Sequence, residues 1–276
     1  MNTRSSSSRR AALTLLEMMV AVTLLAMIMI GLLAMFQQVQ KALHVAHAQT
    51  DVFENARGAM QLVARDLSEM TSAGTNGVNA IGLNGAFVGS TLPIPGQPAV
   101  SVRFDEIFWL TRANDEWQGI GYYVAEDEFS GKTNSGVGTL YRIMAEGRRP
   151  EASTLFKHFL SPGPDAPVPR RVSDGIVHFA FVPTYPVGSN GFVPTGNSFT
   201  FPRRVDADTV VEIPAYVDIE IGVLEPATLK QFRALKDFNT VAAQNFLRDH
   251  VGRIHFFRER VPIRNFVNPY RSNEVP

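Results

Sequence analysis

The stretch that decides the fold lies near the N-terminus, where residues 10–36 read RAALTLLEMMVAVTLLAMIMIGLLAMF. From Met18 to Phe36, nineteen consecutive residues carry no charge. As an α-helix that rises about 1.5 Å per residue, this run would be roughly 28 Å long, close to the thickness of the hydrocarbon core of a bilayer. A buried helix of a soluble protein is rarely apolar on all sides over such a length. We therefore predict a transmembrane segment over residues 13–36.

The charges on either side of this segment predict its orientation. Arg4, Arg9 and Arg10 precede it without any acid, whereas Lys41 is the only basic residue among the next twenty residues other than histidine. Positive charge is retained on the cytoplasmic side of a membrane. We expect a single-pass protein of the inner (cytoplasmic) membrane, with a cytoplasmic N-terminus and a C-terminal domain in the periplasm or outside the cell.

An acidic residue, Glu17, stands at the start of the apolar run. A carboxylate at membrane depth costs about 2.5–3.5 kcal/mol on insertion scales, so such a group normally has a partner. Either Glu17 lies at the level of the headgroups and is solvated there, or it meets a positive charge from another chain.

A cleaved signal peptide is the alternative reading of this region. Ser8-Arg9-Arg10 opens like a twin-arginine signal, and Ala46-His47-Ala48 has the small-x-small form of a signal-peptidase site. That site, however, follows the apolar run by about ten residues. The run is also longer than the 7–15 residues usual in a signal peptide. Cleavage after Ala48 is therefore the less favoured prediction.

Residues 10–17, RAALTLLE, resemble the type IV prepilin signature: a basic leader, a small residue, an aliphatic or aromatic residue, Thr, Leu, an apolar residue and Glu. The resemblance implies that residues 1–12 are a cytoplasmic leader, cut between Ala12 and Leu13 by a prepilin peptidase. It further implies N-methylation of Leu13, and a Glu17 that neutralises the N-terminal amine of a neighbouring subunit during assembly. Family members usually have Gly and Phe at the cut, where this chain has Ala12 and Leu13.

The helix is predicted to continue to about Met70, because no proline occurs before Pro93. Its outer half, residues 37–72, carries an apolar stripe at helical spacing that needs a sheet of the same chain or a partner helix. A membrane-anchored coiled-coil receptor would show the same pattern. Residues 56–67 are similar to minor pseudopilins of the J class, in which an Arg-Asp-Leu run closes the long helix. The stripe consists of Val39, Ala42, Ala46, Phe53, Ala56, Met60, Val63, Leu67 and Met70.

A β-rich region is predicted beyond the helix. Six glycines and three prolines between Gly74 and Pro98 predict a loop over residues 73–98. Residues 99–276 then contain alternating or β-branched runs typical of strands, interrupted by a helical insert at about 226–248. We expect an α+β protein in which the long helix packs on an antiparallel, pilin-like sheet. The predicted strands are 102–110, 120–125, 139–144, 176–182, 212–224 and 253–261.

The insert is expected to place one apolar face against the sheet, although it could instead contact another subunit. That face would consist of Leu229, Phe232, Leu235, Ala242 and Phe246.

No pattern of catalytic or cofactor-binding residues emerges. The 26 basic and 26 acidic residues balance, so no positive field points to a nucleic acid, and the chain has no cysteine. Residues 129–133 end like a phosphate-binding loop but lack its first glycine. The acidic turns at Asp115-Glu116 and 126–128 could offer oxygen ligands to calcium, yet their spacing fits no EF-hand. We predict a protein that is not an enzyme and has no cofactor or metal.

Together, these patterns predict a minor pseudopilin of a type II secretion-like machine. Its expected partners are the prepilin peptidase, other pseudopilin or pilin subunits and the inner membrane. A minor pilin of a surface type IV pilus is the nearest alternative. A membrane-anchored periplasmic receptor or enzyme that keeps its N-terminus belongs to a different class and also remains open.

Overall fold

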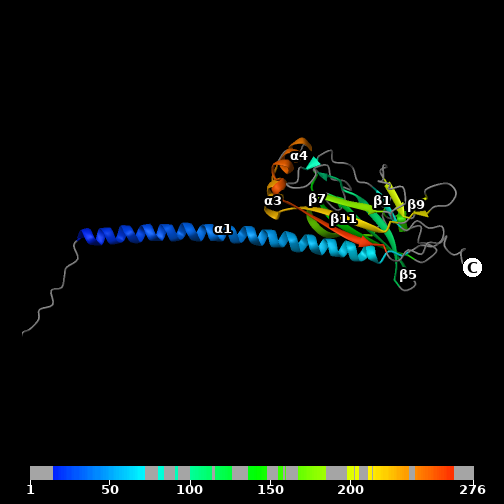
Figure 1. Cartoon of the computed structure of the whole chain (residues 1–276), viewed down its shortest axis with the longest axis horizontal. Helices are drawn as coiled ribbons and strands as arrows, with labels where there is room; N and C mark the ends of the chain where they lie inside the picture. The colour runs from blue at the N-terminus through cyan, green and yellow to red at the C-terminus, as the bar shows by residue number, and fades with distance from the viewer. Residues whose placement is uncertain are drawn as a thin grey trace, which may run out of the picture. The chain divides into compact units, whose positions relative to one another are not determined.

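The computed structural model describes residues 15–71, 80–83, 91–92, 100–113, 116–125, 136–147, 155–157, 159, 167–184, 198–201, 203–204, 211–212, 214–235 and 240–263. One helix, α1, runs unbroken over Leu15–Ser68 (Figure 1). The chain divides into two compact units, residues 1–49 and 50–276, and α1 contributes to both. The predicted long helix is confirmed.

An eight-stranded antiparallel sheet forms most of the second unit. Its strand order is β12-β11-β7-β6-β5-β4-β1-β8, so from β7 to β4 neighbours in the sheet are also neighbours in sequence. The strands are β1 (Ala80–Leu83), β4 (Glu106–Ala113), β5 (Glu116–Ala125), β6 (Gly138–Gly147), β7 (Arg170–Thr184), β8 (Ser198–Phe201), β11 (Tyr216–Leu224) and β12 (Ile254–Pro262). Two short pairs add β2 (Thr91–Leu92) with β3 (Val100–Ser101), and β9 (Arg203–Arg204) with β10 (Val211–Glu212).

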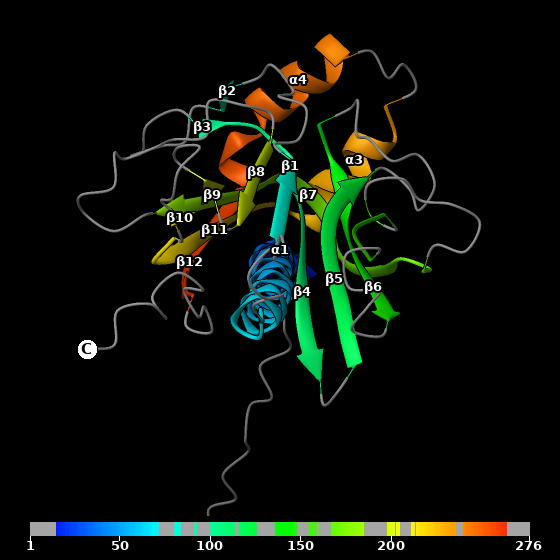
Figure 2. The ribbon, with the colours of Figure 1, turned by 90° about the vertical axis from the view of Figure 1, so that its right-hand side faces the viewer.

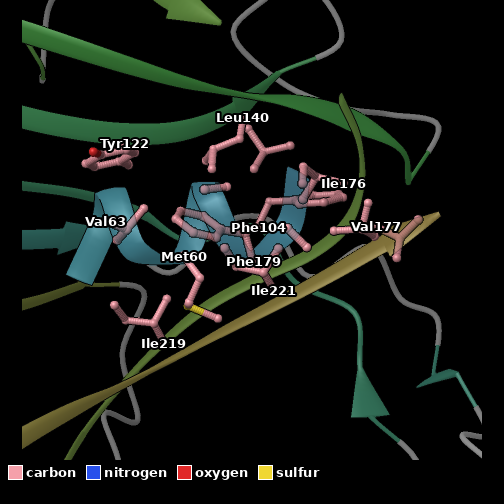
Figure 3. Close-up of a cluster of buried hydrophobic side chains, with 14 of the residues drawn as sticks. Met60, Val63, Phe104, Tyr122, Leu140, Ile176, Val177, Phe179, Ile219 and Ile221 are labelled. Atoms are coloured by element: carbon pink, nitrogen blue, oxygen red, sulfur yellow. The ribbon is translucent and has the colours of Figure 1, made fainter. Parts of the chain in front are cut away.

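The sheet curls around the part of α1 that belongs to the second unit (Figure 2). Met60 and Val63 of α1 point toward apolar side chains from several strands, among them Phe179 and Ile219 (Figure 3). This arrangement confirms the predicted helix on an antiparallel sheet. The buried apolar helix positions are Val52, Ala56, Ala59, Met60, Val63 and Leu67, followed by Met70 just beyond the helix end.

The predicted stripe on the helix was only partly right. Ala56, Met60, Val63, Leu67 and Met70 are buried as predicted, but Phe53 is 50% exposed and Val52 is buried beside it. Val39, Ala42 and Ala46 belong to the first unit, in which every residue whose burial the structure describes is exposed. A straight α-helix drifts by about 20° for every seven residues, so a strict seven-residue repeat cannot stay on one face. The core follows the true helical period rather than the heptad.

Several predicted strand limits need correction. The strand predicted over 102–110 begins only at Glu106, because Arg103 and Asp105 exchange backbone hydrogen bonds with Phe179 of β7 instead. β1 lies inside the predicted loop 73–98, where pairing with both β4 and β8 makes residues 80–83 a strand. The strand predicted over 212–224 begins at Tyr216, and Glu212 belongs to β10.

The side chains of β11 alternate between an apolar and a charged face, as the sequence pattern predicts, but the charged face is also partly buried. Val217, Ile219 and Ile221 are completely buried on the face toward α1. Asp218 occupies the other face but is also buried, at 2% exposure, because two arginines of β12 lie over it. The charged face is therefore not simply solvated.

The predicted insert at 226–248 is two helices, α3 (Pro226–Arg233) and α4 (Thr240–Asp249). Leu229 and Phe232 are buried as expected. In α4, however, Ala243 and Leu247 are buried whereas Ala242 is exposed, because the interruption between the helices breaks the shared period. The buried residues of both helices join the main core cluster, so the insert extends the core of its own chain.

Candidate membrane and assembly segment

The first part of α1 exposes an apolar surface on all sides. The best 18-residue window of this helix has a mean hydropathy of 2.6, and none of it is buried within the chain. In the part of the chain that the structure describes, α1 is the one helix long and apolar enough to cross a membrane. The length, composition and exposure of this part of α1 therefore suit the membrane span that the sequence predicts.

Glu17 lies in the first turn of α1. Its neighbours in the chain, Leu15, Leu16, Met18 and Met19, are all exposed. A carboxylate in this place is favoured by the positive end of the helix dipole. Leu13 precedes it by four residues, about one helical turn. The predicted cleavage residues Ala12 and Leu13, like the rest of the predicted leader, lie outside the described residues.

The opposite end of α1 is tied to the sheet by a buried polar cluster. Asp66, only 5% exposed, accepts hydrogen bonds on Oδ2 from the Tyr122 hydroxyl and from Arg142 Nε, both at 2.6 Å. The indole Nε1 of Trp109 donates to the backbone carbonyl of Asp66 at 3.0 Å. The Trp109 and Tyr122 rings stack with centroids 5.6 Å apart. Three strands, β4, β5 and β6, thus hold one residue of the helix.

The charges in this cluster stabilise each other. Burial, together with the hydrogen bond to Asp66, raises the pKa of Tyr122 far above its usual value, so the phenol stays a neutral donor. Burial alone would lower the pKa of Arg142, but the hydrogen bond and the charge of Asp66 raise it. The cluster is a carboxylate–guanidinium pair supported by a neutral hydroxyl. These contacts are suited to holding the helix end in place.

Sequence reasoning noticed Arg65-Asp66-Leu67 as a helix-closing run but did not predict this tether. The sequence did contain one indication of the tether, because the acidic residue Asp66 stands directly beside Leu67 of the apolar stripe. Its partners Tyr122 and Arg142 lie 56 and 76 residues further along the chain, and only the fold brings them together.

Other polar candidates do not assemble into a site among the described residues. No group of three or more His, Asp or Glu side chains in this part of the chain could hold a metal ion. Glu116 is exposed at the start of β5, while Asp115 and residues 126–128, the other acids considered for calcium, lie outside the described residues. His44 and His47 are exposed on α1.

Comparison with protein families matches residues 7–33 to the model of the prokaryotic N-terminal methylation motif. Comparison with curated proteins and with solved structures finds no significant match. The motif, the long helix and the antiparallel sheet around its second half together support a type IV pilin-like protein. This chain carries the prepilin-type N-terminal segment of that class, which implies processing by prepilin peptidase and pilin-like assembly.

Proposed function

We propose that this chain is a minor pseudopilin, a structural subunit of a type II secretion-like pseudopilus rather than an enzyme. The observation that carries the proposal is the division of α1. Its first part, which holds the matched motif, is apolar and exposed, whereas its second part is enclosed by the chain's own sheet. A helix built in this way can be handed from lipid to neighbouring subunits while its domain stays folded.

The proposed assembly step depends on charge. Cleavage between Ala12 and Leu13 removes the basic leader and creates an amine one turn from Glu17. N-methylation of Leu13 keeps this amine basic. When the amine of one subunit meets Glu17 of its neighbour, each charge loses much of the cost of burial in an apolar environment.

The choice of a pseudopilin over a surface pilin rests on the end of α1. Residues 56–67 are similar to minor pseudopilins of the J class, and the Arg65-Asp66-Leu67 run does close the helix, which ends at Ser68. Deletion of the chain should then impair export of folded proteins while surface pili persist. Loss of surface pili with normal export would instead identify a minor pilin of a type IV pilus.

The mass of the mature protein from its native membrane tests the proposal directly. We expect a chain that begins at Leu13 with one added methyl group. Because Ala12 and Leu13 depart from the usual cleavage residues, processed and unprocessed forms can occur together. Only unprocessed chain in cells with an active prepilin peptidase would contradict the proposal and favour an anchored receptor. A chain that begins at Gln49 would indicate a secreted protein.

Crosslinking in membranes tests the role of Glu17. Glu17→Ala should insert normally but lose its contacts with neighbouring subunits, and Glu17→Asp should be intermediate because its carboxylate reaches less far. Glu54→Ala, which removes an exposed acid from the second unit's part of the same helix, is the matched control. Undiminished crosslinking of Glu17→Ala would show that α1 is only an anchor.

A further inference from the structure

The sheet ends in a long edge strand, β12, which pairs with β11 on one side. Its nine residues pair with β11 in register and without a bulge. Among the described residues no strand lies on its other side. An edge of this length presents a row of backbone donors and acceptors to any extended chain that reaches it.

The register identifies which backbone groups point outward. Glu225 N donates to Arg253 O, and Ile263 N donates to Ala215 O, so the odd-numbered residues of this strand bond to β11. In an antiparallel ladder the residues between them point the other way. Phe256, Arg258 and Arg260 therefore direct both N–H and C=O away from the sheet. Ile254 donates its N–H to Val251 O instead, and Pro262, which has no N–H, ends the row.

The face of β12 toward α1 has an aromatic cluster beside this edge, with charged residues such as Arg57 and Glu259 around it. The Phe53 ring of α1 lies 5.3 Å from His255 and 5.5 Å from Phe257, between ring centroids. A hollow of about 540 Å³ is lined here by Phe53, Arg57, Met60 and Phe257, among others. A second hollow, of about 510 Å³, continues along Gln61, Arg65, Glu259 and Val261. Both lie within the second unit.

The other face of the edge carries two half-exposed arginines, which pair with carboxylates of β11. Arg258 and Arg260 bind Asp218 at 2.7 and 2.8 Å, yet their side chains stay 59% and 56% exposed. Arg258 also lies 3.6 Å from Glu220, and Arg260 lies over the Tyr216 ring at 3.9 Å, so both guanidinium groups have partners on β11. Because more than half of each side chain is still exposed, its remaining N–H groups can donate to a further carboxylate from the outer side.

We propose that β12 is a docking edge for an extended segment of a partner polypeptide, which adds to the sheet as an antiparallel strand. Acidic residues of this segment stand opposite Arg258 and Arg260, and an apolar residue stands opposite Phe257, in the hollow beside Phe53. The backbone supplies the affinity, and the alternating acidic and apolar side chains supply the specificity. The docking concerns the sheet edge alone, so it does not depend on the role proposed for the N-terminal segment.

A second copy of this chain fits this edge less well than a foreign segment. α1 runs in the same direction as β12, since Phe53 lies beside His255 and Gln61 beside Glu259. Antiparallel pairing of two β12 strands would thus turn the α1 segments of the two copies in opposite directions.

Amide exchange of the full chain in detergent micelles tests the docking edge. The probe is the synthetic peptide Glu-Thr-Glu-Val-Thr-Val, whose first and third residues are designed to face Arg260 and Arg258. We expect the peptide to slow exchange at the amides of Phe256, Arg258 and Arg260, while Phe257 and Glu259, already bonded to β11, change little. Fast exchange at the three outward amides is expected without peptide.

Altered peptides separate strand addition from simple charge attraction. N-methylation at the third and fifth residues blocks the bonds to β12 and should weaken binding about tenfold or more, whereas N-methylation at the second and fourth should not. Replacing both glutamates by lysine should also weaken binding about tenfold.

Two results would overturn the proposal. Equal binding of all peptides, or binding without protection of the three amides, would exclude strand addition. Protection of these amides in the free chain would show that the edge is already covered, by a second copy if it depends on protein concentration and by the chain itself if it does not.

Discussion

The two parts of α1 share one helix but differ in what surrounds them. Residues 15–36 are exposed and apolar on every side, whereas residues 50–68 alternate between a buried stripe and an exposed polar face. Isolated helices gain little stability from propensity alone and depend on burial of an apolar face. The second part finds that burial in its own sheet. The first part must find it in lipid or in neighbouring subunits.

This contrast makes opposite predictions for mutations in the two parts. Changes in the sheet or in the buried stripe should lower the free energy of unfolding of the second unit. Changes in the exposed apolar part should leave that free energy unchanged and act on insertion or assembly.

The largest effect is expected from a charge placed under the helix. Val217→Asp puts a carboxylate on a completely buried position of β11 and should cost about 4 kcal/mol of unfolding free energy. Denaturant unfolding of the full chain in detergent, followed by the fluorescence of Trp109 and Trp117, measures it. Val168→Asp, the same change at a valine that is 80% exposed, is the control. Equal denaturant midpoints of unfolding for both variants would show that Val217 does not belong to the core.

Loss of the tether at the end of α1 should have the next largest effect. Asp66→Ala leaves the Arg142 guanidinium, whose side chain is 17% exposed, without its carboxylate, at a cost of about 3 kcal/mol. Glu69→Ala removes an acid from an exposed pair with Arg65 and should change stability by less than about 1 kcal/mol. A similar loss in both variants would mean that the cluster does not fix the helix end.

One substitution made in both parts of α1 compares them directly. Val63→Ala opens a small cavity in the core and should cost about 2 kcal/mol. Val22→Ala, at a position that is 62% exposed, should leave the unfolding free energy of the second unit unchanged. A loss of stability in Val22→Ala would show that the first part of α1 also packs against the domain.

The smallest effect concerns acid pH. Hydrogen bonds from Arg260 and Arg258 lower the pKa of Asp218, and a hydrogen bond from His178 lowers the pKa of Glu220. Since both values are lower in the folded than in the unfolded chain, their stabilisation is present above about pH 4 and is lost as the pH falls through the folded values. Asp218→Asn should therefore lose stability less steeply as the pH falls below about 4. An unchanged slope would show that Asp218 does not contribute.

Much of the fold could be predicted because its signals are local. The charge-free run of 19 residues predicts a membrane helix from its own length and composition, and the prepilin-like residues 10–17 directly precede it. Alternation in β11 likewise placed Val217 and Ile219 on the buried face, because strand side chains point to opposite sides in turn.

The sequence by itself therefore determined the membrane helix, its prepilin-type start and the antiparallel class of the domain. Only the tertiary structure decided which positions on the buried side of α1 enter the core, since the heptad pattern included Phe53 and the core contains Val52. It also decided that Asp66 meets Tyr122 and Arg142, and that β12 ends the sheet. These contacts join residues that are far apart in the chain. The free-energy cost of burying a charged side chain, or of leaving a strand edge unpaired, depends on which groups surround that side chain or edge in the folded protein.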